Sequence, residues 1–326
     1  MAKILVTGGA GYIGSHTRHS LEKRGHSVIV VDNLSRGYRE AVPPGILRVV
    51  DTHDKDKLIA LLRDERIEAV IHFAAYISVG ESTQLPELYF ANNVCGSLAL
   101  FGAMLEAGVN YVVFSSTAAA YGVPNRVPIP ETEPKSPINP YGESKVMVET
   151  ILNWLDRYRG FRSICLRYFN ACGAEPAAGL GERHDPETHL IPLMLRAVHT
   201  GEPVTLFGDD YATPDGTCIR DYIHVSDLAE AHIASIETLL AGGKSDVFNV
   251  GTGSGHSVKE VMAAVERVTG KEVPFKMGPR REGDPPSLVA DSSKLQRLLG
   301  WKPAYTGLDK IVADAWQFAQ QHHFAV

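Results

Sequence analysis

The stretch Ile4-Leu-Val-Thr-Gly-Gly-Ala-Gly-Tyr-Ile-Gly14 decides the predicted fold. It begins with an apolar, β-branched run that predicts a buried strand, and its glycines predict a tight turn into a helix. The glycines Gly8, Gly11 and Gly14 let backbone amides at a helix N-terminus approach a pyrophosphate. A second predicted strand ends in Asp32, at about the 20-residue spacing that places a carboxylate on ribose hydroxyls. We therefore predict a dinucleotide site, with NAD favoured over NADP because the carboxylate repels a 2′-phosphate.

Outward from this stretch, the first half of the chain alternates short apolar runs with longer amphipathic ones. Continuously hydrophobic strands in such an alternation predict a doubly wound α/β fold, with a mostly parallel, Rossmann-like sheet covered on both faces. We expect residues 1–175 to form this domain and residues 176–326 to form a smaller C-terminal α/β lobe, with some chain exchange between them. Expected strands are 4–7, 28–32, 47–50, 69–73, 111–115, 162–167, 204–207 and 219–223. Expected helices are 11–24, 54–65, 89–107, 141–158, 190–199, one that begins at 227, and 257–269, which begins with a capping box. Residues 274–286 are expected to form an irregular loop, and Gly300 is expected to end a further helix.

Composition excludes several classes of protein. The 326 residues are 44% hydrophobic and 21% charged, which is typical of a globular protein and not of a disordered or fibrous one. A net charge of −6 gives no reason to expect nucleic acid or a membrane as partner. The four cysteines show neither a C-x-x-C pair nor zinc-type spacing, so we expect reduced thiols, a cytoplasmic protein and no metal site. The apolar run at the N-terminus is too short for a signal peptide. The apolar stretch 88–105 contains two asparagines, which argue against a membrane span.

A second motif, Tyr141-Gly-Glu-Ser-Lys145, begins the predicted helix 141–158 and carries the expected chemistry. Its spacing places Tyr141 and Lys145 on one helix face, where an ammonium group favours the phenolate and lowers the pKa of the tyrosine. This arrangement predicts Tyr141 as a general base. Thr117 follows the strand 111–115, at the sheet edge where open α/β folds bind ligands, so its hydroxyl is placed to bridge Tyr141 and a substrate hydroxyl.

These motifs together resemble the extended short-chain dehydrogenase/reductase family and, within it, the UDP-glucose (UDP-galactose) 4-epimerases. The resemblance covers nearly the whole chain, and its most specific parts are Arg167-Tyr-Phe-Asn170, Arg220-Asp-Tyr-Ile-His-Val225 and Arg280-Arg-Glu-Gly-Asp284. It implies tightly bound NAD and reversible C4 epimerisation of a UDP-hexose, in which a 4-keto sugar turns about its pyrophosphate linkage. It also implies a UDP-sugar as the small-molecule partner and a homodimer.

The resemblance assigns roles to individual residues, and it makes the C-terminal lobe the nucleotide-sugar-binding part. The residues it implies to be catalytic are Tyr141, Lys145 and Thr117. Those implied to bind the cofactor are Gly8, Gly11, Tyr12, Ile13, Gly14, Asp32, Asn33, Asp51, Ala74, Ala75, Asn92, Ser115, Lys145 and Tyr168. Those implied to bind the substrate are Thr117, Tyr141, Asn170, His189, Leu190, Phe207, Arg220, Arg281, Asp284 and Leu288.

Two departures from the family pattern leave the substrate range open. Ile77 stands where some members have a lysine near the cofactor, and Leu288 stands where a tyrosine narrows the sugar pocket of some members. The sugar can therefore be a hexose, an N-acetylhexosamine or a pentose. A 4,6-dehydratase is a second interpretation, but Thr117 is followed by two alanines instead of the Asp-Glu pair of those enzymes. A non-catalytic NAD-binding protein of the same fold is a third.

Overall fold

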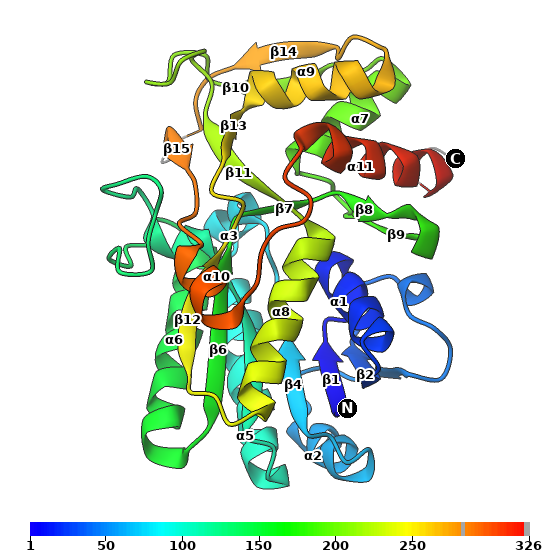
Figure 1. Ribbon diagram of the computed structural model, residues 1–326, viewed down its shortest axis with the longest axis vertical. Helices are drawn as coiled ribbons and strands as arrows, with labels where there is room; N and C mark the ends of the chain where they lie inside the picture. Colours follow the sequence, from blue (N-terminus) through cyan, green and yellow to red (C-terminus); the bar gives the residue numbers. More distant parts are fainter. Residues whose placement is uncertain (282–283, 323–326) are drawn as a thin grey trace.

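A seven-stranded sheet forms the larger part of the computed structural model, which describes residues 1–281 and 284–322 (Figure 1). Every neighbouring pair in this sheet is parallel, as the sequence predicted. The order reverses direction at β1, so the crevice at the carboxyl ends of β1 and β4 is the ligand-binding point of such a fold. In sheet order the strands are β12 (Asp246–Val250), β6 (Arg162–Tyr168), β5 (Tyr111–Thr117), β4 (Ala69–His72), β1 (Lys3–Thr7), β2 (Ser27–Asp32) and β3 (Leu47–Val49).

Helices cover both faces of this sheet, which confirms the doubly wound fold. Successive residues of β1 point into different cores: Ile4 and Val6 belong to the core under one layer of helices, and Leu5 to the core under the other. One layer contains α1 (Tyr12–Lys23), α8 (Val225–Leu240) and α10 (Ser293–Leu299), and the other contains α2 (Lys55–Asp64), α5 (Gly96–Ala107) and α6 (Pro140–Arg159).

The remaining elements form a smaller lobe at the carboxyl end of the sheet, drawn at the top of Figure 1. Its helices α7 (Leu190–Thr200), α9 (Val258–Thr269) and α11 (Leu308–His322) share a third core. The chain crosses into it through β7 (Asn170–Cys172) and β11 (Ile219–His224), which pair in parallel, and returns to the large sheet through α8 and β12. The other lobe elements are β8 (Ala174–Glu175), β9 (Leu180–Gly181), β10 (Val204–Phe207), β13 (Gly255–Ser257), β14 (Phe275–Gly278) and β15 (Ser287–Leu288).

Most expected elements are confirmed, and three differences stand out. The expected helix 89–107 is interrupted: α4 (Pro86–Tyr89) leads into a π-helical turn, Phe90–Cys95, before α5 begins. The expectation of an irregular loop at 274–286 is wrong at Phe275–Gly278, because this exposed segment pairs with β10 as strand β14. Glu282 and Gly283 of that loop lie outside the described residues. The sequence analysis also did not predict the helices α3 (Val79–Gln84) and α11, or the strands β7, β8, β9, β12, β13 and β15.

Helix ends follow the expected chemistry. Asn139 caps α6, since its side-chain oxygen accepts a hydrogen bond from the Gly142 amide at 2.8 Å, and proline occupies the first helical position. The capping box at Ser257 is present, and Gly300 ends α10 with a φ of +68°. One helical stretch, Pro86–Ala107, is long and apolar enough to cross a membrane by length and composition, but 50% of its 18-residue apolar window is buried inside the protein, as in a core helix.

Candidate active site

The glycine loop between β1 and α1 leaves no room for side chains. A Cβ atom on Gly8, whose φ is +69°, would lie 2.6 Å from the Ala74 amide nitrogen. A Cβ atom on Gly14 would lie 2.3 Å from the Gly8 carbonyl oxygen. The helix that follows begins after Gly11 with no side-chain cap and no acidic residue in its first turn. Its free amides and positive dipole end therefore suit the pyrophosphate of a dinucleotide.

Carboxylates at the ends of β2 and β3 complete the predicted dinucleotide site. Asp32 accepts hydrogen bonds from the amides of Ala10 at 3.0 Å and Leu34 at 2.8 Å. Burial raises the pKa of Asp32, and these two bonds oppose the rise. Asn33 donates to Asp51 at 2.8 Å. Burial also acts to raise the pKa of Asp51, but hydrogen bonds from His53 and Asn33 outweigh it and the pKa is lowered.

The side chains of Tyr12 and Ile13, which follow this loop, make contacts within the protein. The Tyr12 hydroxyl donates to the Gly173 carbonyl oxygen at 2.7 Å, so the buried phenol joins α1 to the smaller lobe. Ile13 packs against the core beneath the sheet. Ile77, where some family members have lysine, is 43% exposed.

The π-helical turn before α5 fixes the loop that follows β4. Asn93, which the sequence analysis did not select, is buried and accepts a hydrogen bond from the Tyr76 amide at 2.8 Å. Its amide donates to the Tyr76 carbonyl oxygen at 3.0 Å and to the Ser144 hydroxyl at 3.1 Å. It thus ties the loop after β4 to helix α6, and π-turns of this kind are frequent at functional sites. The predicted cofactor residues around this turn are Ala74, Ala75 and Asn92.

The three predicted catalytic residues meet at the carboxyl end of β5. Lys145 is buried, and its ammonium nitrogen donates to the Ser115 carbonyl oxygen at 2.8 Å, 6.0 Å from the centre of the Tyr141 ring. Thr117 is hydrogen-bonded to Tyr141. The Ser115 hydroxyl is hydrogen-bonded to the hydroxyl of Tyr168. Residues from β5, β6 and α6 therefore converge on one point of the sheet edge.

The expectation that Lys145 lowers the pKa of Tyr141 is not met in this structure. Burial raises the pKa of Tyr141, and the hydrogen bond with Thr117 only opposes this. Burial likewise lowers the pKa of Lys145, to about 7. The reason is that both groups lose their hydration in the same buried site, and desolvation disfavours each charged form. The two charges would stabilise each other if they formed together.

Behind this site lies a buried polar network that the sequence analysis missed. Arg167 binds Glu149 with two hydrogen bonds, from Nε at 2.8 Å and from Nη2 at 2.6 Å. Ser116, next to Thr117 in β5, donates to the same carboxylate at 2.6 Å. The network fixes β5 and β6 to α6 one helical turn beyond Lys145.

The predicted substrate residues lie on the smaller lobe and its junction with the sheet. The Arg281 guanidinium stacks over the Phe207 ring at 4.2 Å, and Arg220 pairs with Asp284. Leu288 is opposite Arg220 in the pairing of β15 with β11. It packs against a cluster that contains Ala118, the residue after Thr117, so this part of the lobe adjoins the catalytic residues.

The other substrate candidates begin the elements that border this junction. Asn170 begins β7 and pairs in register with Tyr222 of β11. His189 precedes α7, and its Nδ1 lies 2.8 Å from a Glu187 carboxylate oxygen. Leu190 is the first residue of α7 and packs against the lobe core. Sequence analysis selected His189 but not the acidic residues around it.

A dinucleotide loop and a Thr-Tyr-Lys group at one edge of a parallel sheet define a dinucleotide-dependent enzyme of the Rossmann type. Comparison with known proteins agrees: residues 4–251 match the model of the NAD dependent epimerase/dehydratase family. The chain belongs to this family.

Its relatives include a UDP-glucose 4-epimerase of Lactobacillus helveticus, 49% identical over 322 residues, with 98% of each chain covered. The crystal structure of UDP-glucose 4-epimerase from Brucella ovis in complex with NAD has a TM-score of 0.94 and 46% identity, covering 97% of this chain and 98% of that one. The UDP-Glc/GlcNAc 4-epimerase of Campylobacter jejuni has a TM-score of 0.85 and 42% identity, covering 98% of this chain and 100% of that one.

Proposed function

We propose that this protein is an isomerase that catalyses the reversible C4 epimerisation of a UDP-hexose, interconverting UDP-galactose and UDP-glucose with tightly bound NAD. The observation that carries the proposal is the meeting of Thr117, Tyr141 and Lys145 at the carboxyl end of β5, which the smaller lobe adjoins through Leu288, opposite Arg220. Near-full-length similarity to UDP-glucose 4-epimerases supports the same reaction.

Residues of the larger part would hold the cofactor. The free amides after Gly11 suit its pyrophosphate, and Asp32 suits a ribose. Lys145 and Tyr168 lie at the opposite end of this site, beside the catalytic tyrosine. NAD, when bound, supplies the hydride acceptor and donor for the sugar carbon.

The protein's own chemistry is proton transfer at Tyr141. As a phenolate, Tyr141 accepts the proton of the sugar 4-hydroxyl, and Thr117 holds that hydroxyl in hydrogen-bonding reach. The phenolate forms when Tyr141 gives up its own proton and the neutral Lys145 amine takes one up, so that each charge offsets the desolvation of the other. Return of the proton from Tyr141 then completes the exchange at C4.

The smaller lobe supplies the groups that suit a nucleoside diphosphate. Arg220 and Arg281 present guanidinium groups, and each guanidinium can bind two phosphate oxygens at once. Phe207 offers an aromatic face to a uracil ring, and in this structure the Arg281 guanidinium covers that face at 4.2 Å. We infer that the guanidinium exchanges this stacking contact for the diphosphate when the nucleotide enters.

We also propose activity on UDP-N-acetylhexosamines. Leu288 is shorter than a tyrosine and packs at the junction beside Ala118 and Phe169. A tyrosine there would extend over the sugar site and restrict the room for an N-acetyl group. The related Campylobacter jejuni protein is named as a UDP-Glc/GlcNAc 4-epimerase.

The other two interpretations of the sequence are less well supported. A 4,6-dehydratase needs carboxylates directly after Thr117, where this chain has Ala118 and Ala119. A non-catalytic NAD-binding protein has no need of a buried Lys145, whose desolvation is costly.

The test is to incubate the purified protein with UDP-galactose, UDP-N-acetylgalactosamine and UDP-arabinose, without added NAD, and to separate the products. We expect UDP-glucose from the first and slower conversion of the second. Loss of all conversion in Tyr141→Phe, with the fold and bound NAD retained, would assign the reaction to this site. Formation of a 4-keto-6-deoxy sugar, or no conversion of any substrate by protein that retains NAD, would contradict the proposal.

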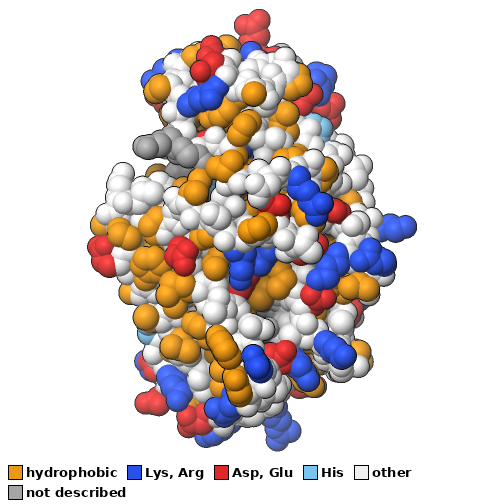
Figure 2. Space-filling model, turned by 90° about the vertical axis from the view of Figure 1, so that its left-hand side faces the viewer, with side chains coloured by type: hydrophobic (Ala, Val, Ile, Leu, Met, Phe, Trp, Pro, Cys, Tyr) orange, Lys and Arg blue, Asp and Glu red, His pale blue; other side chains and the backbone are white. Residues whose placement is uncertain are grey.

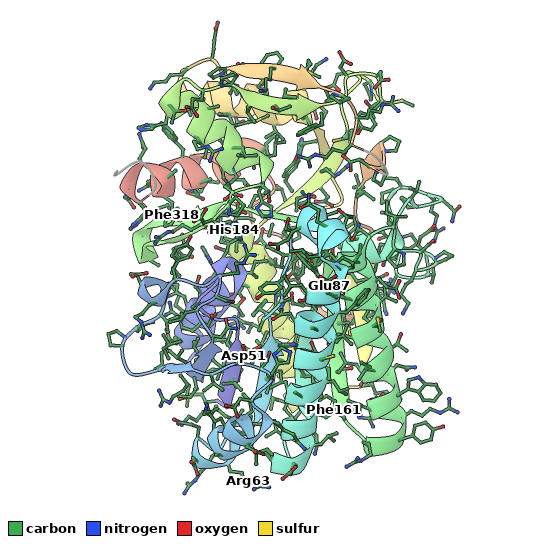
Figure 3. The ribbon with its side chains drawn as sticks, turned by 180° about the vertical axis from the view of Figure 1, so that it is seen from behind. Asp51, Arg63, Glu87, Phe161, His184 and Phe318 are labelled. Atoms are coloured by element: carbon green, nitrogen blue, oxygen red, sulfur yellow. The ribbon has the colours of Figure 1, made fainter. Side chains whose placement is uncertain are left out.

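We further propose that the protein is a homodimer formed through α5 and α6. These helices lie side by side on the face seen in Figure 3. Trp154 and Tyr158 on α6 are 50% and 67% exposed and stack on each other, and Leu98 on α5 is 51% exposed. Figure 2, which faces the α6 side, shows hydrophobic side chains among the charged ones. Exposed apolar surface of this kind is typical of an interface.

Light scattering on the purified protein is expected to give the mass of a dimer, and Leu98→Glu with Trp154→Glu the mass of a monomer. A monomeric wild type would contradict the dimer.

We propose a cytoplasmic location because the four cysteines are free thiols, of which Cys165, Cys172 and Cys218 are buried.

A further inference from the structure

Four side chains between β9 and α7 converge on one point, and we call them the His-Glu cluster. All of their candidate ligand atoms lie within 4.8 Å of one another. In Figure 3 His184 marks this point, at the level where the smaller lobe meets the sheet domain. The cluster consists of Glu182, His184, Glu187 and His189.

The four histidine–glutamate distances in the His-Glu cluster are close to those between neighbouring ligands of a metal ion. Nδ1 of His189 lies 3.0 Å from a Glu182 oxygen and 2.8 Å from a Glu187 oxygen. Nδ1 of His184 lies 3.4 Å and 3.5 Å from oxygens of the same two glutamates. For ligands about 2.0–2.1 Å from a tetrahedral metal ion, neighbouring ligand atoms are about 3.3 Å apart. The four distances fall on both sides of this value.

The orientation of the two histidines also fits the coordination of one shared metal ion. Both present Nδ1, and each Nδ1 faces both carboxylates rather than one. Nδ1 of His184 is buried and makes no hydrogen bond. The two imidazole rings are 4.7 Å apart, with an angle of 41° between their planes. A simple ion pair needs one imidazole for each carboxylate and does not require the two rings to share both acceptors.

We propose that the His-Glu cluster is a structural binding site for one divalent metal ion of the zinc type, held by two imidazole nitrogens and two carboxylate oxygens. Imidazole and carboxylate in a four-coordinate arrangement suit Zn²⁺ and the related ions Co²⁺ and Ni²⁺. The expectation of no metal site came from the spacing of the cysteines alone. The sequence carries the four groups in the pattern Glu-x-His-x-x-Glu-x-His over 182–189, which contains no cysteine.

A metal ion at this position would fix the segment that joins the cofactor loop to the smaller lobe. The Tyr12 ring, in the first turn of α1, meets the His184 ring edge-on at 6.4 Å. His189 directly precedes α7 and the predicted substrate residue Leu190. Binding through Nδ1 leaves Nε2 of His189 available to another partner. The proposal does not depend on the proposed epimerase reaction, because it concerns metal affinity and not turnover.

The test uses full-length protein without a histidine tag, treated with a chelator and then titrated with Co²⁺ while visible absorption is recorded. We expect saturable binding of one Co²⁺ per chain, with the strong absorption of four-coordinate Co²⁺, and displacement by Zn²⁺. Glu187→Gln and His184→Gln are each expected to lower the Co²⁺ affinity at least about tenfold, as loss of groups at metal sites typically does. Addition of Zn²⁺ is expected to raise the melting temperature of the wild type and not of these variants.

His256→Gln is the matched control, because His256 lies 3.8 Å from Glu260 in a surface pair outside the cluster. This variant is expected to bind Co²⁺ as the wild type does. Failure of the folded wild type to bind Co²⁺ in a saturable way would overturn the proposal and leave an ion-pair network, whatever the variants do. Equal affinity in wild type, Glu187→Gln and His184→Gln would also overturn it. Circular dichroism establishes that each variant is folded, and if one unfolds, the other decides.

Discussion

Replacing Glu149 by alanine is expected to destabilise the protein by about 3–5 kcal/mol, the usual cost of removing one partner of a buried ion pair. Glu149 is buried on α6 and receives two hydrogen bonds from Arg167 and one from Ser116, all between 2.6 and 2.8 Å. Without the carboxylate, the buried Arg167 guanidinium keeps its hydrogen bond to the Tyr121 hydroxyl at 2.9 Å, which carries no compensating charge. The exposed partner Lys135, 3.4 Å from Glu149, contributes little because water screens it.

Urea unfolding followed by circular dichroism at pH 7 measures this loss. Asn153→Ala, at an exposed position on the same helix, is the control and is expected to stay within about 0.5 kcal/mol of the wild type. The double variant Glu149→Leu with Arg167→Met removes both charges and is expected to recover much of the stability. A loss below about 1 kcal/mol in Glu149→Ala would refute the argument, since it would mean that Arg167 is not left as an uncompensated buried charge.

The ion pair between Glu149 and Arg167 also predicts how the stability of the fold depends on pH. Burial acts to raise the pKa of Glu149, but the hydrogen bonds and charge of Arg167 outweigh it and the pKa is lowered in the folded state. A lowered pKa means that the carboxylate stabilises the fold above its unfolded pKa of about 4.3, and that this stabilisation is lost as the pH falls through the folded value. The stability difference between wild type and Glu149→Ala is therefore expected to be constant above pH ~5 and to shrink in acid. A difference that grows on acidification would contradict this sign.

Three further predictions concern the site itself. Tyr141→Phe is expected to lower kcat at least about 100-fold with the fold intact, because it removes the proton acceptor, and near wild-type turnover would exclude that role. Asp32→Ala is expected to release NAD during purification, measured as absorbance of the denatured supernatant, and wild type that is active only with added NADP would contradict the cofactor assignment. Leu288→Tyr is expected to reduce kcat/KM for UDP-N-acetylgalactosamine more than for UDP-galactose; an unchanged ratio would show that position 288 does not control the pocket.

The local parts of the fold were predictable because neighbouring residues decide them. The strand before Gly8 and the capping box at Ser257 depend on patterns of a few residues, and both are present as expected. Strand β12 was missed because the run Asp246–Val250 is short and its polar Asn249 interrupts the apolar pattern. Its place beside β6 depends on a pairing between residues about 80 positions apart, which no local pattern specifies.

The candidate site likewise has a part that the sequence predicts and a part that depends on packing. The residues that carry chemistry, such as Tyr141 and Lys145, have a spacing that a helix converts directly into one face. The residues that hold these groups in place have no such spacing in the sequence. Glu149 faces Arg167 only because α6 packs across β5 and β6, and Asn93 reaches Ser144 only through the π-turn. Sequence patterns therefore indicate which groups react, while the packing determines which groups hold them.

The pKa of Tyr141 shows how this difference changes a chemical conclusion. The spacing correctly placed an ammonium near a phenol, and from the attraction alone a lowered tyrosine pKa follows. The fold adds that both groups are fully buried, so that desolvation raises the pKa of Tyr141 and lowers that of Lys145 to about 7. When both charges form together, their mutual attraction offsets part of the desolvation that disfavours each charge alone. The site is thus prepared for proton transfer when substrate arrives, and it need not hold a phenolate beforehand.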